Sequence, residues 1–144
     1  MSAESNKALA RRLLDEAFNA GNIDVVDELV TPDFVNHDAA LPEAVIGPDA
    51  AKASIQGYRS AFPDLRITIE EQIADDQGVV TRWSAKGTHQ GDLMGMAPTG
   101  KQATVTGITL DRIVDGRIAE SWTNWDTLGM LQQLGVVPVL ATTA

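Results

Sequence analysis

The segment Trp122-Thr-Asn-Trp125-Asp126 places an acid beside two of the three tryptophans of the chain. Indole rings around a carboxyl group disfavour its charged form, which would raise its pKa toward the range useful for proton transfer. A strand-like segment ends at Asp126 and a helix-like segment begins there, so the same residue also suits a helix N-cap. Position 129 is glycine, so the Glu or Gln of a capping box is absent. The two roles are compatible, because a carboxylate has two oxygens.

The two histidines, His37 and His89, are further candidates. His89 lies in GTHQGDLMGMAPTGK, a connection that predicts a flexible rim or lid, where it is either exposed to solvent or exchanges a proton with a ligand. Asn36 and His37 favour turns, but one of them could donate to a substrate carbonyl. Their side chains alternate in direction, so we expect one to face inward. The histidines lie 52 positions apart without a carboxylate cluster, which argues against a metal site.

Two more side chains could either bind a ligand or stabilise the fold. Tyr58, the only tyrosine, lies on the apolar stripe of a predicted helix, where core packing accounts for it if its hydroxyl finds a partner. Arg82 alternates with Trp83, so one of the two faces inward. An inward Arg82 would need a carboxylate such as Glu120 or Asp126, in a structural ion pair or beside a ligand.

The bulk composition bounds the class of protein. The 144 residues fit one domain, 1–144, and the 44% hydrophobic and 22% charged residues are typical of a soluble globular protein. The net charge of −9 argues against binding to nucleic acid or to an anionic membrane surface. Cysteine is absent, which excludes disulfides and a cysteine nucleophile. The polar N-terminal segment does not resemble a secretory signal, so we expect a cytoplasmic protein.

Hydrophobic periodicity predicts the order of the elements. Stripes with a helical period indicate three helices, at 6–20, 22–30 and 48–62. Residues 31–44 are expected to form a brief extended piece and a loop. Alternating patterns then indicate four strands and a short final helix, at 65–74, 78–89, 103–114, 116–126 and 128–134. This order predicts an α+β domain with helices packed on one face of a curved, mostly antiparallel sheet.

The last predicted strand suggests where a pocket lies. With a period of two, Ile118, Glu120, Trp122, Asn124 and Asp126 share one face. We expect this face to point toward the helices, with Trp122 both in the core and on the pocket wall. Polar groups on an inward face need partners or a wet cavity, so sheet and helices should enclose a pocket. In the strand at 103–114, apolar residues occur on both faces, which predicts a two-fold homodimer through the sheets.

Several blocks together resemble one known family. The blocks FVNHDA, AFPDLRITIE, ITLDRIVDGRIAESW and WDTLGMLQQLG, with the histidine-bearing loop between them, are similar to SnoaL-like polyketide cyclases of the NTF2-like superfamily. The resemblance implies a cone-shaped barrel around a buried pocket, a homodimer, and ring closure by intramolecular aldol condensation without metal or cofactor. It also implies that the acid ending the last long strand, here Asp126, acts as acid/base. The GTHxG block favours a functional role for His89.

These features predict acid/base chemistry on a small, mostly apolar carbonyl compound. A carboxylate of raised pKa would deprotonate a carbon between two carbonyls, and His89, Asn36 or His37 would stabilise the enolate. Two alternatives remain: another enzyme on the same scaffold, such as an epoxide hydrolase or a steroid-type isomerase, or a non-catalytic binding protein. Limonene-type hydrolases carry Arg-x-Asp on one strand. Asp111 and Arg112 are adjacent here and should face opposite ways, which argues against a hydrolase.

Overall fold

In the computed structural model, which describes residues 2–140, four short helical segments come before the first strand. The first, α1 (Ala3–Arg12), continues without a break into a π-helical turn, η1 (Leu13–Asn19). A 3-10 turn, η2 (Ile23–Val25), leads into α2 (Val26–Leu29). The predicted first and second helices therefore exist. The first changes from α-helical to π-helical along its length, and the second from 3-10 to α-helical. No helix in residues 2–140 is long and apolar enough to cross a membrane.

One six-stranded sheet, in the order β2-β1-β6-β5-β4-β3, forms the body of the domain. Its strands are β1 (Val30–Asp38), β2 (Val45–Ile46), β3 (Arg66–Ala74), β4 (Gly78–Thr88), β5 (Gln102–Val114) and β6 (Arg117–Trp125). The pair β1–β6 is parallel and the other four pairs are antiparallel. The predicted α+β class with a mostly antiparallel sheet is confirmed.

The segment 31–44 departs most from expectation, because most of its first half belongs to the nine-residue strand β1. Local turn-forming residues suggested only a brief extended piece there. Pairing with β6 on one side and β2 on the other supplies backbone hydrogen bonds that the local sequence does not reveal. This placement matters for the site, because it brings β1 next to the last strand.

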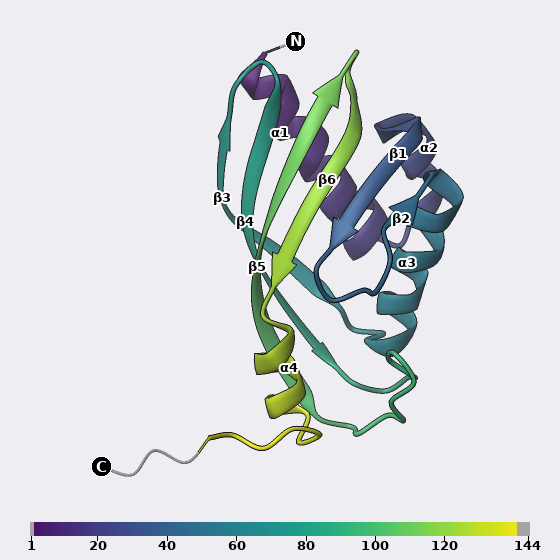
Figure 1. The fold of residues 1–144 in the computed structure, drawn as a ribbon, viewed down its shortest axis with the longest axis vertical. Helices are drawn as coiled ribbons and strands as arrows, with labels where there is room; N and C mark the ends of the chain where they lie inside the picture. The colour runs from purple at the N-terminus through teal and green to yellow at the C-terminus, as the bar shows by residue number, and fades with distance from the viewer. Residues whose placement is uncertain (1, 141–144) are drawn as a thin grey trace.

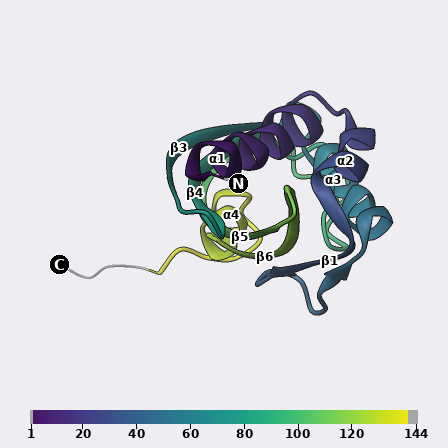
Figure 2. The ribbon, with the colours of Figure 1, turned by 90° about the horizontal axis from the view of Figure 1, so that it is seen from above.

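The sheet curves around its inner face, and the helices close the open side (Figures 1 and 2). Helix α1 lies across β3 and β4, whereas α3 (Pro48–Ala61) lies beside β1. The short α4 (Thr127–Gln133) follows β6 at the end of the cone opposite the N-terminus. Apolar residues from η2, α2, β1 and β6 fill the end of the cone under α1; the fully buried ones include Val26, Leu29, Val30 and Ile118.

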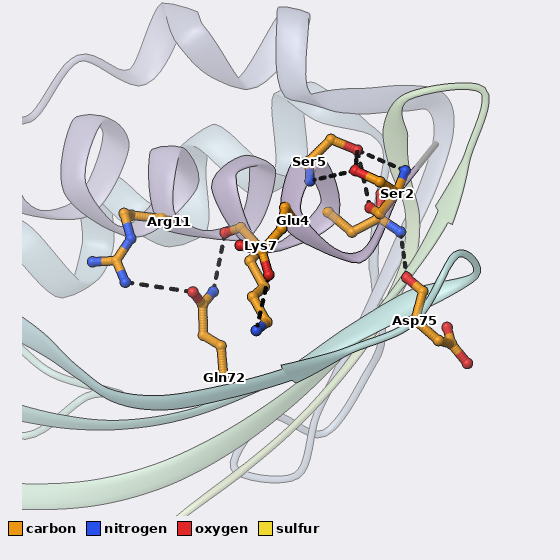
Figure 3. Close-up of polar contacts among 8 residues, drawn as sticks. Ser2, Glu4, Ser5, Lys7, Arg11, Gln72 and Asp75 are labelled. Carbon is orange, nitrogen blue, oxygen red and sulfur yellow. Dashed lines mark hydrogen bonds and ion pairs between the residues drawn. The ribbon is translucent and has the colours of Figure 1, made fainter.

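Polar contacts fix α1 to the edge of the sheet (Figure 3). Ser2 and Ser5 form a capping box at its N-terminus. Gln72 of β3 donates from Nε2 to the Lys7 carbonyl at 3.1 Å. The buried Asn6 donates from Nδ2 to the Asp75 carbonyl at 2.9 Å. These bonds hold the helix over the inner face at the end of the cone where the chain begins.

A β-bulge in β6 decides which of its side chains face inward. The β5–β6 hairpin turns at Asp115 and Gly116, which both have positive φ, the conformation that an Asp-Gly pair adopts readily in a tight hairpin. Ile113 pairs with Ile118, but Arg112 pairs with Glu120, so Ala119 is an extra residue. Side chains alternate along a strand, so this one residue reverses the direction of every later side chain.

The expected common face of Ile118, Trp122 and Asp126 is therefore wrong. Ile118 is buried in the core, but beyond the bulge it is Ser121, Thr123 and Trp125 that face the cavity. Glu120, Trp122 and Asn124 lie on the outer face of the sheet. The period of two was correct on both sides of Ala119, but the sequence pattern did not reveal the interruption.

A glycine on β5 allows a large inner side chain to lie flat on the sheet. Gly107 pairs with Trp83, and a Cβ at position 107 would overlap the indole ring. We expect Gly107→Ala to destabilise the protein by about 1–3 kcal/mol, or several degrees in Tm, because a packed core resists added volume. Gly57→Ala on the exposed face of α3 is the matched control, since nothing lies within 4 Å of its added methyl group. Thermal unfolding of both variants checks this; an unchanged Tm for Gly107→Ala would contradict it.

Candidate active site

A cavity of about 160 Å³ lies between the sheet and the helices. It exceeds the roughly 150 Å³ of an apolar cavity known to hold benzene, so it can accept at least one organic ring. Most of its lining is aliphatic or aromatic, with contributions from α1, η1, α3 and the inner face of the sheet. Most of the polar side chains that the sheet contributes to the wall lie on β1, β6 and β5, in two rows that run across the strands.

The first row, here called the Asp38 row, contains Asp38, Thr123 and Thr109 on β1, β6 and β5. The buried carboxylate of Asp38 accepts three hydrogen bonds. Oδ1 accepts from the Ala40 backbone N–H at 2.9 Å and from Trp125 Nε1–H at 3.1 Å. Oδ2 accepts from the Tyr58 hydroxyl at 3.0 Å. A carboxylate with this many donors is a fixed acceptor that orients the phenol and the indole.

The second row, the Asp111 row, contains Asn36, Ser121 and Asp111 on the same three strands. Asp111 is 3% exposed, and its Oδ1 accepts a hydrogen bond from the Ser121 hydroxyl at 2.5 Å. On the other side of Ser121, the Oδ1 atom of Asn36 is buried and has no hydrogen-bond partner within residues 2–140. This row therefore has hydrogen-bonding capacity that the protein leaves open.

The two rows place titratable groups in different environments. Burial raises the pKa of Asp111 to about 6, although the hydrogen bond from Ser121 opposes the rise. Burial, and then the negative charge of Asp38, raise the pKa of Tyr58 far above its ordinary value, so its hydroxyl stays protonated and donates. A carboxyl group with a pKa near 6 can both accept and return a proton close to neutral pH. Asp111 therefore has the proton affinity that acid/base chemistry in this cavity requires.

Two of the predicted ligand-binding residues line the cavity. Asn36 faces inward and His37 outward, so the prediction that one of the two faces inward is confirmed. Tyr58 reaches the cavity from α3 and finds a hydroxyl partner in Asp38. Asn36 and Tyr58 are thus brought to the same wall, on the two rows.

Two other predicted site residues, Trp122 and His37, lie on the outer face. Trp122 stacks on His37, with ring centroids 5.4 Å apart, and the Arg112 guanidinium lies 5.0 Å from the Trp122 ring. Glu120 links these groups, accepting from Arg112 at 3.0 Å and meeting His37 Nε2 at 2.8 Å. The expectation that Trp122 lines the pocket is wrong, because the bulge turns it outward. His37, in the same way, takes part in this surface cluster.

Arg82 also faces outward, because Trp83 takes the inner position on β4. Its Nε lies 3.3 Å from Oε1 of Glu71 on β3, and both side chains are more than half exposed. An exposed pair of this kind contributes little to stability. Arg82 thus forms a surface ion pair rather than the expected inward contact with Glu120 or Asp126. Asp111 and Arg112 do face opposite ways, as their adjacency predicted.

Asp126 is exposed and caps α4. Its Oδ1 accepts from the Gly129 N–H at 2.9 Å, which is the N-cap geometry that the sequence allowed. Its side chain is not among the described groups that line the cavity, so the expected inward position is wrong. Trp125 does reach the cavity, but adjacent residues on a strand point to opposite faces and the aromatic wall does not enclose Asp126.

His89 is fully buried and is the first residue of the long connection between β4 and β5. Its Nδ1 accepts from the Thr99 backbone N–H at 3.2 Å, so the neutral ring carries its proton on Nε2. That Nε2 is buried without a partner in residues 2–140. The ring packs on Phe62, with centroids 5.6 Å apart, and Phe62 in turn lines the cavity. His89 therefore lies behind the wall, where it ties the two ends of the connection together.

The sequence interpretation missed both buried carboxylates of the wall. Asp38 directly follows the Asn-His pair, and its two-residue spacing from the inward Asn36 was a usable signal. The sequence contains no such signal for Asp111, because both faces of β5 carry apolar residues and the pattern does not show which face is buried. Across residues 2–140, no group of three or more His, Asp or Glu side chains is arranged to hold a metal ion.

Comparisons with known proteins agree with this arrangement of helices and sheet. The family model described as SnoaL-like polyketide cyclase matches residues 8–134. Nogalonic acid methyl ester cyclase of Streptomyces nogalater is 35% identical over 122 residues, which cover 83% of this chain and 90% of that protein. Aklanonic acid methyl ester cyclase DauD of Streptomyces sp. (strain C5) is 34% identical, with coverage of 88% and 80%. The solved structure of TsrD from Streptomyces laurentii superposes with a TM-score of 0.85 at 26% identity, covering 95% of this chain and 99% of TsrD.

The buried Asp111 predicts an unusual dependence of stability on pH. Its pKa is about 6 in the folded state and near 3.8 when unfolded, so between these values the folded state holds the extra proton and stability falls as pH rises. Above pH 6 the burial costs about 3 kcal/mol. We expect the free energy of unfolding in urea to be the same for Asp111→Asn and the natural protein at pH 4. At pH 8 it should be higher for Asp111→Asn. Asp126→Asn, which keeps an exposed cap, should show no such difference. An Asp111→Asn advantage that is equal at both pH values would contradict the buried charge.

Proposed function

Because this chain belongs to the SnoaL-like polyketide cyclase family, we propose that it closes a ring in a small, mostly apolar carbonyl compound by intramolecular aldol condensation. We propose further that it does so without a metal or an organic cofactor. The observation that carries the proposal is Asp111, a carboxyl group of raised pKa on the wall of an apolar cavity. Its relatives are named as cyclases of aklanonic and nogalonic acid methyl esters, which makes these two esters the first compounds to test.

In the proposed reaction Asp111 acts first as base and then as acid. Its carboxylate removes a proton from a carbon between two carbonyls, and the resulting enolate carbon attacks a ketone carbon of the same molecule. The new alkoxide then takes the proton back from Asp111, so the group ends in its starting state. A pKa near 6 suits both steps, and such assistance typically accelerates a reaction about 10²–10⁴-fold. Enclosure in the cavity favours the folded conformer that closes the ring.

The other polar groups of the wall orient the substrate in this proposal. Asp38 fixes the Tyr58 hydroxyl and the Trp125 indole, so both side chains keep one rotamer. A wall held in this way needs no rearrangement when the substrate binds. His89, which the family resemblance made a catalytic candidate, would act indirectly here, by holding the β4–β5 connection against Phe62. Asp126 would serve only as a cap.

The assignment of Asp111 is tested by two matched Asp→Asn variants. Asp111→Asn should lower turnover of nogalonic or aklanonic acid methyl ester by about 10² or more, because an amide cannot accept a proton at neutral pH. Asp126→Asn should retain turnover within a few fold, because Asn caps a helix about as well as Asp. In the natural protein, kcat/KM should rise with pH and level off above about pH 6.

The opposite pattern would transfer the role to Asp126. If Asp126→Asn lost turnover while folded, and Asp111→Asn kept it, the acid at the end of β6 would be the proton-transfer group despite its exposed position. If the natural protein bound both esters without converting them, the chain would be a binding protein with the same cavity.

A homodimer through the outer face of the sheet is also proposed. Ile108 and Leu110, on β5 near the middle of the sheet, are 50% and 43% exposed, and Val114 continues the apolar strip at 45%. Apolar side chains in a row on an open sheet face favour a partner on that face. Ile108→Glu should convert a dimer into a monomer in light scattering at micromolar concentration, with an unchanged circular dichroism spectrum. A natural protein that is already monomeric there would contradict the proposal.

A further inference from the structure

In the Asp111 row, Asn36 Oδ1 is the one atom in the described residues that is both buried and without a hydrogen-bond partner. The side chain of Asn36 lines the cavity. Buried acceptors in native proteins are nearly always satisfied, so an exception at a cavity wall calls for an explanation. A hydrogen-bond donor on a ligand would provide the missing partner.

The position of Asn36 relative to Asp111 limits where that donor can be. Asn36 pairs with Ser121 on β6, and Ser121 pairs with Asp111 on β5. Adjacent strands are 4.7–4.9 Å apart, so the backbones at Asn36 and Asp111 are separated by about 10 Å. A ring system lying across β6 can therefore contact both side chains at once.

The strongest donors of the wall are already used within the protein. The Tyr58 hydroxyl and Trp125 Nε1–H donate to Asp38, and Trp83 Nε1–H donates to Thr109 Oγ1 at 3.0 Å. The Ser121 hydroxyl donates to Asp111. These donors are therefore occupied within the protein, whereas Asn36 Oδ1 has no donor in the described residues, so a ligand that itself donates is the better complement to this atom.

The charges of the cavity wall also limit which ligands can bind. Two carboxylates, those of Asp38 and Asp111, are buried there. Among the residues that line the cavity, the one cationic side chain is Lys86, which is exposed. A ligand carboxylate would enter a low-dielectric space next to like charges without a buried cation to pair with. The cavity therefore favours neutral ligands.

From these observations we infer that Asn36 is a specificity-determining residue, whose Oδ1 accepts a hydrogen bond from a phenol or enol hydroxyl of a neutral ring compound lying across β6. This inference rests on the proposed function only in taking that ligand to be the substrate. The hydroxyl would sit about two strands from the carbon that faces Asp111. A compound lacking it, or carrying a free carboxylate in its place, would bind less well.

Three naphthalene probes test the inference through binding alone. 2-Naphthol donates a hydrogen bond, 2-methoxynaphthalene can only accept one, and 2-naphthoate is an anion at pH 7.5. Trp83 and Trp125 line the cavity, so quenching of tryptophan fluorescence can report binding. We expect 2-naphthol to bind about five- to tenfold more tightly than its methyl ether, and 2-naphthoate to bind more weakly than both.

Asn36→Leu should remove the preference by weakening 2-naphthol about five- to tenfold while leaving 2-methoxynaphthalene unchanged. Asn124→Leu is the matched control, because Asn124 is exposed on β6 and should leave all three affinities as they are. Equal or tighter binding of the methyl ether by the natural protein would overturn the inference without any variant. The inference would also be overturned if Asn36→Leu still bound 2-naphthol more tightly than 2-methoxynaphthalene. Asp111→Asn should keep the preference for 2-naphthol, so a failure of the catalytic assignment and a failure of this inference give different results.

Discussion

The extra residue in β6, Ala119, sets the character of both faces of the sheet. Before it, Ile118 enters the apolar core; after it, Ser121, Thr123 and Trp125 form the polar middle of the cavity wall. Without the bulge, the tight turn at Asp115 and Gly116 would place Trp122 and Glu120 inside instead. Both polar rows depend on this local irregularity, because each includes a residue of β6.

The elements of the fold were predictable because they depend on hydrophobic patterns between residues close together in the sequence. Helical stripes and alternating patterns predicted the order of the helices and of the last four strands. Strand β1 was underestimated, since its nine residues owe their conformation to partners far away in the chain. Pairings of that kind leave little trace in a single sequence, and β1 carries two of the polar groups of the cavity.

The candidate site was predictable only where a face could be assigned without knowing the register. Alternation predicted that one of Asn36 and His37 faces inward, without deciding which, and a helical stripe placed Tyr58 toward the core. Asp126 was misplaced because two tryptophans near it in sequence were taken to surround it in space. Asp111 could not be found, because β5 carries apolar residues on both faces and nothing marks which one is buried.

The two buried carboxylates differ in the number of donors around them, and that difference separates their roles. Three hydrogen bonds satisfy Asp38, which therefore acts as a structural acceptor for Tyr58 and Trp125. Asp111 receives one hydrogen bond from a side chain and lies among apolar groups, so its charge is poorly stabilised and its pKa rises. The destabilisation that results is the same physical effect that would make Asp111 a useful base. In the proposed reaction, the apolar core under α1 offsets that cost, while the Asp38 row keeps the cavity wall rigid around the reacting carbon.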